Sequence, residues 1–461
     1  RMVRTARHGM FGLLDRYSGY VEHREFVQMR EEMSGGYGGV GVTIVPHDDG
    51  LQIMSVRENG PAGKVGLQSG DILIGTDSVS FARLGPGESS LHLRGEPGTS
   101  VAVRVYRPAT GDSTQVTLVR ERVPLVHVPF AGFTDNDVMY IRVLDFDAGT
   151  ADDIRAAVDS LLNVPGRKPA GVILDLRGNP GGLFAEAYRT ANIFLEPGRF
   201  IVGTDGRSRW NKETHRSIYH DLTNGLPIAV IVNRGSASSA EIVAGSLQQS
   251  DRAILVGDTT YGKGLVQGFF GFPDGDGIRL TVSRYYFDNG LYLNRFDSTL
   301  EDIGSGLPPD HFYAYPELDP FIRSLENSLL LQEFAYQHME EILGESDLTR
   351  YGPILGAFAH YVGTRNFVFS TETTEAAEEL EQTARQERAP AAIRNLSERL
   401  LRASQAEDRR LLFVHADYIA LRLRQIAYER EYGITRTYQE VILPNRGDIR
   451  LAEELLLNRR T

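Results

Sequence analysis

Three short runs of apolar residues constrain the fold of this chain more than any other feature. They are GVILDL at 171–176, PIAVIVN at 227–233 and RAILVG at 252–257, and each continues into a turn rich in Gly, Ser or Thr. Such runs are typical of strands buried on both faces, and the helical patterns between them supply the connections that parallel strands need. Residues 123–316 are therefore expected to form an α/β layer with a largely parallel or mixed sheet.

The rest of the 461 residues follows other patterns, which divides the chain into four parts. Residues 1–33 carry apolar positions at helical spacing and are expected to form a helical arm. Residues 34–122 hold five short strand-like runs separated by turn signals, which is typical of a small β-rich module. Residues 317–461 are polar with helical spacing, so we expect a helical C-terminal region.

Composition and the start of the chain narrow the class of protein. The 49 basic and 61 acidic residues give a net charge of −12, which argues against nucleic acid or an anionic lipid surface as the main partner. No window approaches the ~18 uninterrupted apolar residues that a membrane-spanning helix needs. Because there is no Cys, a disulfide, a thiolate zinc site and a cysteine nucleophile are excluded. The chain begins at Arg1 rather than Met, so we expect any signal peptide or anchor to lie upstream.

Two glycine-rich segments resemble nucleotide-binding motifs but lack essential parts of them. Residues 36–41 satisfy G-x-G-x-x-G, yet a strand-like run follows where a helix is needed. Residues 257–264 nearly match a phosphate-binding loop, but Gly264 stands where the Ser or Thr that binds Mg²⁺ must be. We therefore expect neither a cofactor nor a metal ion.

The turn after the second apolar run has the features that a serine nucleophile needs. Residues 235–241 (GSASSAE) leave a buried strand and enter a helix, where small side chains leave a hydroxyl uncovered beside free amide N–H groups. No His lies nearby to act as the base. Lys263 follows the next apolar run between two glycines, and a buried lysine can act as a base because burial lowers its pKa.

Each of these features alone has an ordinary explanation. A serine-rich turn is more often a helix cap, and a Gly-Lys-Gly sequence is more often a surface turn. Their positions after consecutive core strands make a Ser-Lys dyad the leading hypothesis. The turn at 175–182 (DLRGNPGG) could supply a second backbone donor to an oxyanion, or could simply connect a strand to a helix.

Taken in order, these segments resemble the carboxyl-terminal processing peptidases, also called tail-specific proteases. The resemblance begins at GLLDRYSGY near the N-terminus and continues to about residue 310, and residues 34–122 resemble a PDZ domain. It implies an α/β multidomain protein: a crotonase- or Clp-like protease core with an inserted β-rich PDZ domain and a helical C-terminal region.

The resemblance also implies site residues. The family nucleophile falls on Ser238, the general base on Lys263, and the residue that orients this lysine on Gln267. The backbone N–H groups of Ser239 and Gly181 would form the oxyanion hole, with Gly182 as the alternative to Gly181. The loop of the PDZ-like module that would bind a substrate C-terminus consists of Gly39, Val40, Gly41 and Val42.

The expected function is that of a serine endopeptidase that binds apolar protein C-termini through its PDZ domain and cleaves through an acyl-enzyme. The resemblance further suggests an extracytoplasmic protein, and residues 317–461 are a candidate region for homo-oligomer contacts. Two alternatives remain: an idle scaffold that only binds C-termini, and a crotonase-type enzyme acting on small thioesters. The joint presence of Ser238, Lys263 and Gln267 argues against the scaffold, and the PDZ-like module argues against the thioester enzyme.

Overall fold

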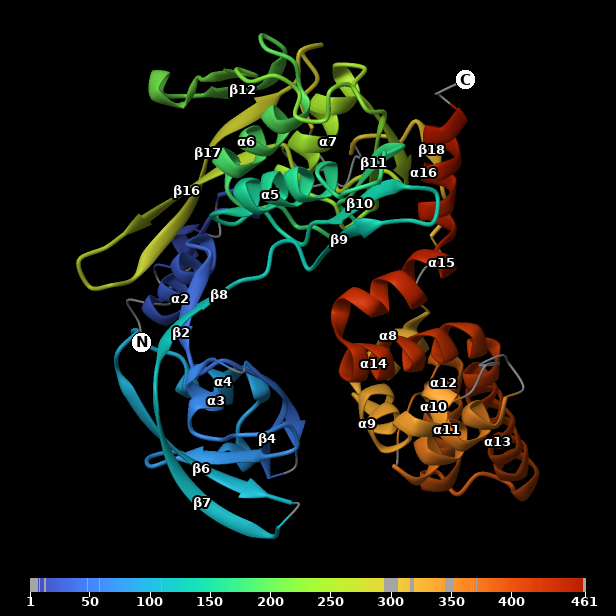
Figure 1. The fold of residues 1–461 in the computed structure, drawn as a ribbon. Coiled ribbons are helices and arrows are strands. Elements are labelled where there is room, and N and C mark those ends of the chain that lie inside the picture. The colour runs from blue at the N-terminus through green and yellow to red at the C-terminus, as the bar shows by residue number, and fades with distance from the viewer. Residues whose placement is uncertain are drawn as a thin grey trace. The chain divides into compact units, whose positions relative to one another are not determined.

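The computed structural model divides the chain into two compact units, Arg1–Ala314 with Gly447–Thr461, and Tyr315–Arg446 (Figure 1). The residues that the structure describes are 7, 9–11, 14–47, 49–57, 59–108, 110–293, 306–315, 319–344, 352–365, 367, 369 and 371–458. None of the described helices is long and apolar enough to cross a membrane.

A six-stranded sheet forms the centre of the first unit, in the order β18-β15-β14-β11-β10-β9 (Figure 1). All neighbouring strands are parallel except β9 and β10, which are antiparallel. The expected α/β core is therefore confirmed, and three of the strands coincide with the three apolar runs. The strands are β9 (Phe130–Phe133), β10 (Val138–Arg142), β11 (Gly171–Asp175), β14 (Ile228–Val232), β15 (Ala253–Gly257) and β18 (His311–Phe312).

Helices cover both faces of this sheet. Helices α5 (Thr150–Leu162), α6 (Phe184–Phe194) and α7 (Ser239–Gln249) share a buried core with Val172 and Leu174 of β11. Side chains alternate along a strand, so Gly171 faces the other way, and a Cβ at Gly171 would lie 3.2 Å from Leu456 Cδ1 of α16 (Gly447–Asn458). Helix α16, from the end of the chain, thus covers the second face of β11, β14 and β15.

A second sheet is built around β17, in the order β1-β17-β12-β13 with β16 on the other edge of β17. Its strands are β1 (Gly19–Val21), β12 (Phe200–Gly206), β13 (Thr214–Arg216), β16 (Leu265–Gly271) and β17 (Gly277–Tyr286), with a 3₁₀ turn (Arg209–Asn211) between β12 and β13. The helical arm expected at 1–33 is only partly helical: α2 spans His23–Met33, but β1 precedes it. The strand forms because it covers the part of the β17 edge that β12 leaves open. Residues 1–6, 8, 12 and 13 of the expected arm lie outside the described residues.

The β-rich module contains the five strands that the sequence indicates, arranged as an antiparallel sheet in chain order around its own buried core. A separate pair of strands, β2 and β8, leads into and out of the module. The elements are β2 (Gly36–Gly39), β3 (Val42–His47), β4 (Gly50–Val56), α3 (Pro61–Lys64), β5 (Ile72–Thr76), a 3₁₀ turn (Phe81–Arg83), α4 (Pro86–Leu93), β6 (Ser100–Arg107), β7 (Asp112–Val119) and β8 (Glu121–Pro124).

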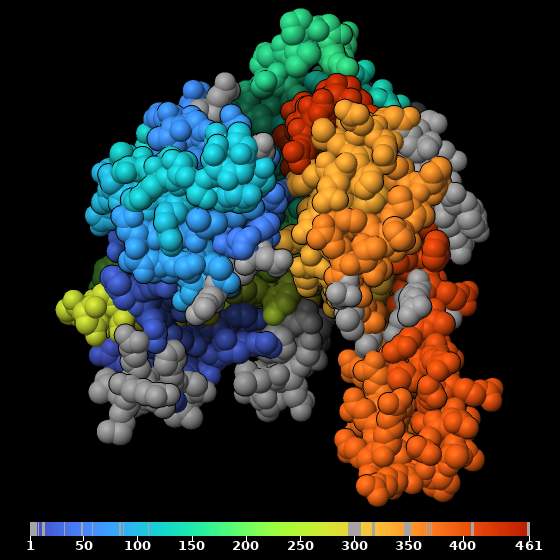
Figure 2. Space-filling view, turned by 90° about the horizontal axis from the view of Figure 1, so that it is seen from below, coloured from blue at the N-terminus to red at the C-terminus, as the bar shows by residue number. Residues whose placement is uncertain are grey.

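The second unit is helical, as expected for the C-terminal region. In Figure 2 the two helices α12 (Glu372–Gln386) and α13 (Ala391–Val414), in darker orange, extend from the lighter orange helices of the same unit. The sequence predicts a single helical region at 317–461, but residues 447–458 belong to the first unit. There α16 buries Ile449, Ala452 and Leu456. The other helices of the second unit are α8 (Pro320–Asn327), α9 (Leu330–Gln337), α10 (Met339–Gly344), α11 (Pro353–Thr364), α14 (Ala416–Thr437), a π-helical turn (Tyr438–Ile442) and α15 (Leu443–Asn445).

Candidate active site

Ser238 occupies a strained turn between β14 and the N-terminus of α7. Its backbone angles are φ 55° and ψ −115°, a region that a residue with a side chain rarely adopts and that costs about 1–3 kcal/mol. The turn is held by the Ala237 N–H, which donates to the Asn179 carbonyl at 2.9 Å, and by the Ser236 hydroxyl, which donates to the Leu176 carbonyl at 2.7 Å. Strain that the surroundings enforce in this way is typical of a functional position.

The fold brings Ser238, Lys263 and Gln267 to one pocket of about 280 Å³. Ser238 comes from the start of α7, while Lys263 and Gln267 come from the connection after β15 and from β16. Asp147, Arg279 and Tyr285 also line the pocket, and its apolar lining includes Met29, Met33, Leu183, Phe184, Ile242, Leu265, Val266 and Phe269. A polypeptide bound there would meet a serine hydroxyl and an amine together.

Lys263 has the environment of a base. Burial lowers the pKa of its amine below the ordinary value, and the positive charge of Arg279 lowers that pKa further. Its Nζ donates to Gln267 Oε1 at 3.2 Å and lies 5.1 Å from the centre of the Tyr17 ring. A lowered pKa raises the neutral fraction of the amine, which is the form that can accept a proton.

The orientation of Gln267 is fixed from the N-terminal part of the chain. Its Nε2 donates to the Tyr17 carbonyl at 2.7 Å, and Arg279 Nε donates to the same carbonyl at 2.7 Å. The Tyr17 turn is itself held by Asp15, whose carboxylate accepts hydrogen bonds from the backbone of residues 17 and 18 and from Thr281 Oγ1. With its NH₂ group engaged, the Gln267 amide must present its oxygen to Lys263.

Glu241 is a site residue that the sequence reasoning missed. Its buried carboxylate accepts hydrogen bonds from the N–H groups of Ser238 and Lys263, both at 2.8 Å, from the Gly262 N–H at 2.6 Å and from Thr260 Oγ1. Burial raises the pKa of Glu241, while these donors favour the ionised form and oppose the rise. Glu241 therefore ties the nucleophile turn to the lysine loop. The S-x-x-E spacing of a capping box could have identified it.

Gly181 and Gly182 adjoin the nucleophile where no side chain would fit. A Cβ at Gly181 would lie 2.7 Å from Ser238 Cβ, and a Cβ at Gly182 would lie 2.5 Å from the Phe146 carbonyl. Both glycines have positive φ, 99° and 153°. The DLRGNPGG turn is therefore more than a connection, because Gly181 lets its backbone lie against Ser238 and Gly182 lets its backbone lie against that of Phe146.

The two glycines differ in where their amides point. The Gly181 N–H donates to Asn179 Oδ1 at 2.9 Å and is thus engaged within its own turn. Gly182 forms a β-bridge with Phe146: the Phe146 N–H donates to the Gly181 carbonyl, and the Leu183 N–H donates to the Phe146 carbonyl. The N–H and the carbonyl of Gly182 itself therefore point away from Phe146. There its carbonyl accepts from Ser239 Oγ at 3.1 Å. This geometry favours Gly182, the alternative considered from sequence, over Gly181 as the partner of the Ser239 amide.

The β-rich module has a groove of its own, of about 430 Å³. One wall is the segment expected to bind a C-terminus, residues 39–42, and its continuation into β3. The opposite wall comes from α4 and the residues after it, including Leu93 and Arg94. A groove between a strand and a helix is the arrangement in which a peptide can add to the strand edge.

Comparisons with known proteins identify the same two domains, the β-rich module followed by the α/β core. The model of peptidase family S41 matches residues 137–303, and the PDZ domain model matches residues 38–118. The carboxy-terminal-processing protease of Bartonella bacilliformis is 30% identical over 316 residues, which cover 68% of this chain and 72% of that protein. The carboxy-terminal processing protease CtpA of Bacillus subtilis is 31% identical over 296 residues, which cover 64% of this chain and 62% of that protein.

Among solved structures, the photosystem II D1 C-terminal processing protease is similar, with 26% identity and a TM-score of 0.40 over 68% of this chain and 82% of that chain. The family assignment rests on the sequence matches, since a relative at 30% identity is covered over more than two thirds of its length. With a PDZ domain preceding the peptidase core, the chain belongs to peptidase family S41, with the carboxy-terminal processing serine proteases.

Proposed function

We propose that the chain is a serine endopeptidase in which Ser238 is the nucleophile and Lys263 the general base. The observation that carries this proposal is one pocket lined by both a strained serine and a lysine of lowered pKa, with the backbone N–H groups of both bound to Glu241. A serine hydroxyl is inert until a base removes its proton. A neutral amine in the same pocket supplies that base without a histidine.

The proposed reaction has two halves. In the first, Ser238 Oγ attacks the peptide carbonyl as its proton passes to Lys263 Nζ, and the Ser239 and Gly182 amides stabilise the oxyanion. The Lys263 ammonium then gives that proton to the leaving amine, which departs and leaves an acyl-enzyme. In the second half, Lys263 takes a proton from a water molecule as its oxygen attacks the acyl carbonyl, and returns that proton to Ser238 Oγ as the ester bond breaks and the acyl group leaves as a carboxylic acid. Gln267 holds Nζ in place through the hydrogen bond to Oε1.

Direct detection of the acyl-enzyme tests this proposal. Mixing the chain with an unfolded protein substrate and quenching in acid should leave a fraction of the chain heavier by one substrate fragment, with the added mass on Ser238 by peptide mapping. Ser238→Ala should neither cleave nor gain mass. Cleavage by Ser238→Ala at the wild-type rate would reject the mechanism. Binding without cleavage by the wild type would favour the idle scaffold.

We also propose that the groove beside residues 39–42 binds the C-terminus of the substrate. Backbone N–H groups of such a loop can hold a terminal carboxylate, and the apolar side chains that line the groove, among them Val42, Ile44 and Leu93, can contact the last side chain. A substrate with an apolar C-terminus should be cleaved faster than the same substrate with an amidated C-terminus. Equal rates for the two would reject carboxylate capture, while leaving the Ser-Lys mechanism unaffected.

We further propose that a second copy of the chain binds the α12–α13 hairpin. Among the described residues, six exposed large apolar side chains lie on these two helices, namely Leu380, Ile393, Leu396, Leu400, Phe413 and Val414. Sedimentation velocity of the wild type and of Leu396→Glu tests this: the wild type should sediment as an oligomer that the variant weakens. An extracytoplasmic location is likewise a proposal, based on the resemblance, and cell fractionation tests it.

A further inference from the structure

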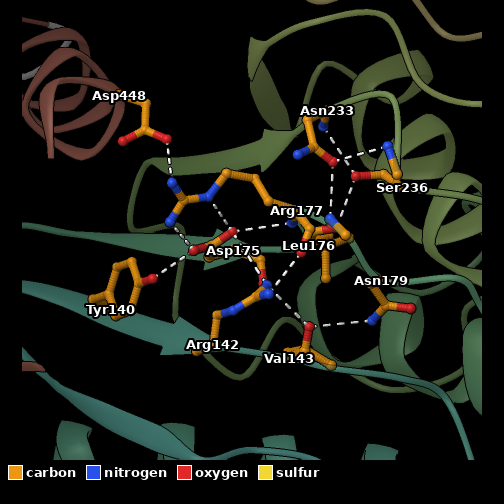
Figure 3. A network of polar contacts seen from close by, with 12 residues as sticks. Tyr140, Arg142, Val143, Asp175, Leu176, Arg177, Asn179, Asn233, Ser236 and Asp448 are labelled. Carbon is orange, nitrogen blue, oxygen red and sulfur yellow. Dashed lines mark hydrogen bonds and ion pairs between the residues drawn. The ribbon is translucent and has the colours of Figure 1, made fainter. Parts of the chain in front are cut away.

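A buried cluster of charged residues that the proposed mechanism does not use surrounds the first residues of the DLRGNPGG turn (Figure 3). Asp175 and Asp448 are fully buried, and Arg177 is 9% exposed. Arg177 donates from Nε to Asp175 Oδ1 at 2.8 Å and from its Nη atoms to Asp175 Oδ2 and Asp448 Oδ2. Arg142 and the Tyr140 hydroxyl complete the set around Asp175.

The alternation of strand β11 explains why this cluster is buried. Asp175 lies four residues after Gly171 and therefore on the same face, the face that α16 covers. Burial alone would raise the pKa of Asp175, but the charges of Arg177 and Arg142 outweigh it and hold that pKa well below its usual range. The Asp175 carboxylate is thus charged. Because α16 covers it, the charges of the buried cluster must compensate one another.

Asp448, the second residue of α16, provides that balance. Two carboxylates, Asp175 and Asp448, face two guanidinium groups, Arg177 and Arg142, so the cluster has no net charge. Without the Asp448 carboxylate the cluster would carry one excess positive charge, and one arm of the Arg177 guanidinium would lose its partner. Breaking a buried ion pair from one side is strongly unfavourable, because the remaining charge is left without compensation.

The position of Arg177 sets the start of the turn that leads to Gly182. Its carbonyl accepts from Arg142 Nη2 at 2.7 Å, and the next residue, Gly178, donates its N–H to Asn233 Oδ1 at 2.8 Å. Four residues later the chain reaches Gly182, whose amide points to the side of Ser239. Since reacting groups misplaced by about 1 Å can cost ~100-fold in rate, small movements at Arg177 matter to the oxyanion hole.

We infer that Asp448 is a positioning residue for the oxyanion turn and that the C-terminal helix α16 is part of the active-site support. It acts through Arg177 and touches no reacting atom. Asp448 is 271 positions from Arg177 and lies outside residues 137–303, the segment matched by the S41 peptidase model. The inference rests on the proposed function, because it assigns the turn at 178–182 to the oxyanion.

The test compares Asp448→Asn with Glu453→Gln in the full chain. Glu453 lies on the same helix and is also nearly buried, but its carboxylate accepts from Thr134 Oγ1 and not from the turn. Asp448→Asn should lower kcat about 10-fold or more with KM unchanged within about twofold, since only transition-state stabilisation is lost. A peptide boronate, which forms a tetrahedral adduct with the serine, should bind more weakly by a similar factor. Glu453→Gln should lose comparable thermal stability and keep its kcat.

The inference would be overturned if Asp448→Asn and Glu453→Gln had the same kcat and the same boronate affinity, whether both keep the wild-type values or both lose activity equally. If Asp448→Asn does not fold, Asp448→Glu keeps the charge and displaces the carboxylate by one methylene. Its kcat should then fall about threefold with KM retained, and an unchanged kcat would overturn the inference. If cleavage requires Ser238 but the Asp448 variants keep the wild-type kcat, only the role of Asp448 is rejected and the proposed function stands. Loss of the proposed function shows instead as cleavage that persists in Ser238→Ala.

Discussion

Gln267 donates its side-chain amide to the backbone carbonyl of Tyr17 over 2.7 Å, although the two residues are 250 positions apart. That hydrogen bond decides which end of the amide faces Lys263. The base of the proposed dyad therefore depends on a turn near the N-terminus, while the turn proposed to bind the oxyanion is linked through Arg177 to Asp448 of α16. Both ends of the first unit support the chemistry at its centre.

Gln267→Glu should shift the pH dependence of cleavage. A carboxylate beside Lys263 Nζ stabilises the protonated amine, which raises its pKa and lowers the fraction available as base at neutral pH. The profile of kcat/KM against pH should therefore rise at higher pH than in the wild type, and activity at pH 7 should fall about 10-fold for every pH unit by which the inflection moves up. Gln267→Ala serves as the control, since it removes the hydrogen bond without adding charge. An inflection at the same pH in Gln267→Glu and the wild type would contradict the assignment.

Arg279→Gln should move the same inflection upward for a different reason. After burial, the charge of Arg279 is the next cause that lowers the pKa of Lys263, so removing it lets that pKa rise towards its ordinary value of about 10.4. Arg279→Lys keeps the charge and should keep the inflection near the wild-type pH, even if the lost bond to the Tyr17 carbonyl lowers kcat. Identical profiles for the Gln and Lys variants would show that charge is not the cause.

Glu241→Gln should impair both the nucleophile turn and the lysine loop. The amide of Gln brings two N–H donors to a position where four donors already converge on one carboxylate, which leaves buried donors unpaired at a cost of about 1–3 kcal/mol. We expect kcat to fall about 100-fold or more. Glu186→Gln is the matched control, because Glu186 is buried and caps α5 through the Ala151 N–H. A kcat that falls equally in both variants would show a general loss of folding instead.

The core could be predicted from the sequence because its signals are local. The apolar runs at 171–176, 227–233 and 252–257 each contain one parallel strand, and the turns after them bring Ser238 and Lys263 together at one end of the sheet. The pattern at 1–33 predicts the helical residues 23–33 but not the strand at Gly19–Val21, because pairing with the open edge of β17 determines that strand. Helical spacing could not show that α16 leaves the other C-terminal helices and packs on the sheet.

The sequence could predict which residue types form the candidate site and in which order they occur, but not the contacts that orient them. Whether Gly181 or Gly182 faces the serine depends on the direction of one backbone amide, which pairing with Phe146 fixes. The partners of Gln267 and Arg177 are a carbonyl 250 positions away and a carboxylate 271 positions away. No local pattern marks such contacts, since they exist only once distant segments have packed.

The apolar side chains of the active-site pocket predict which residue is preferred beside the scissile bond. A substrate side chain that enters the 280 Å³ pocket meets Leu183, Ile242 and Leu265, so Ala, Val or Leu should be accepted. Asp at that position should lower kcat/KM about 10-fold or more, because its carboxylate would lose water and would stabilise the protonated form of Lys263, which cannot accept a proton. A series of peptides differing at this one residue measures the effect. Cleavage of the Asp peptide at the rate of the Leu peptide would contradict this use of the pocket.

The most direct test of the central claim is the activity of Lys263→Arg against an unfolded protein substrate, compared with the wild type and Lys263→Ala. Arginine keeps the positive charge and most of the length but stays protonated, so it cannot act as a base. We predict cleavage by the wild type and no cleavage by either variant, with the fold of both retained by circular dichroism. Substantial cleavage by Lys263→Arg would show that this residue contributes charge and not proton transfer, and would contradict the Ser-Lys mechanism.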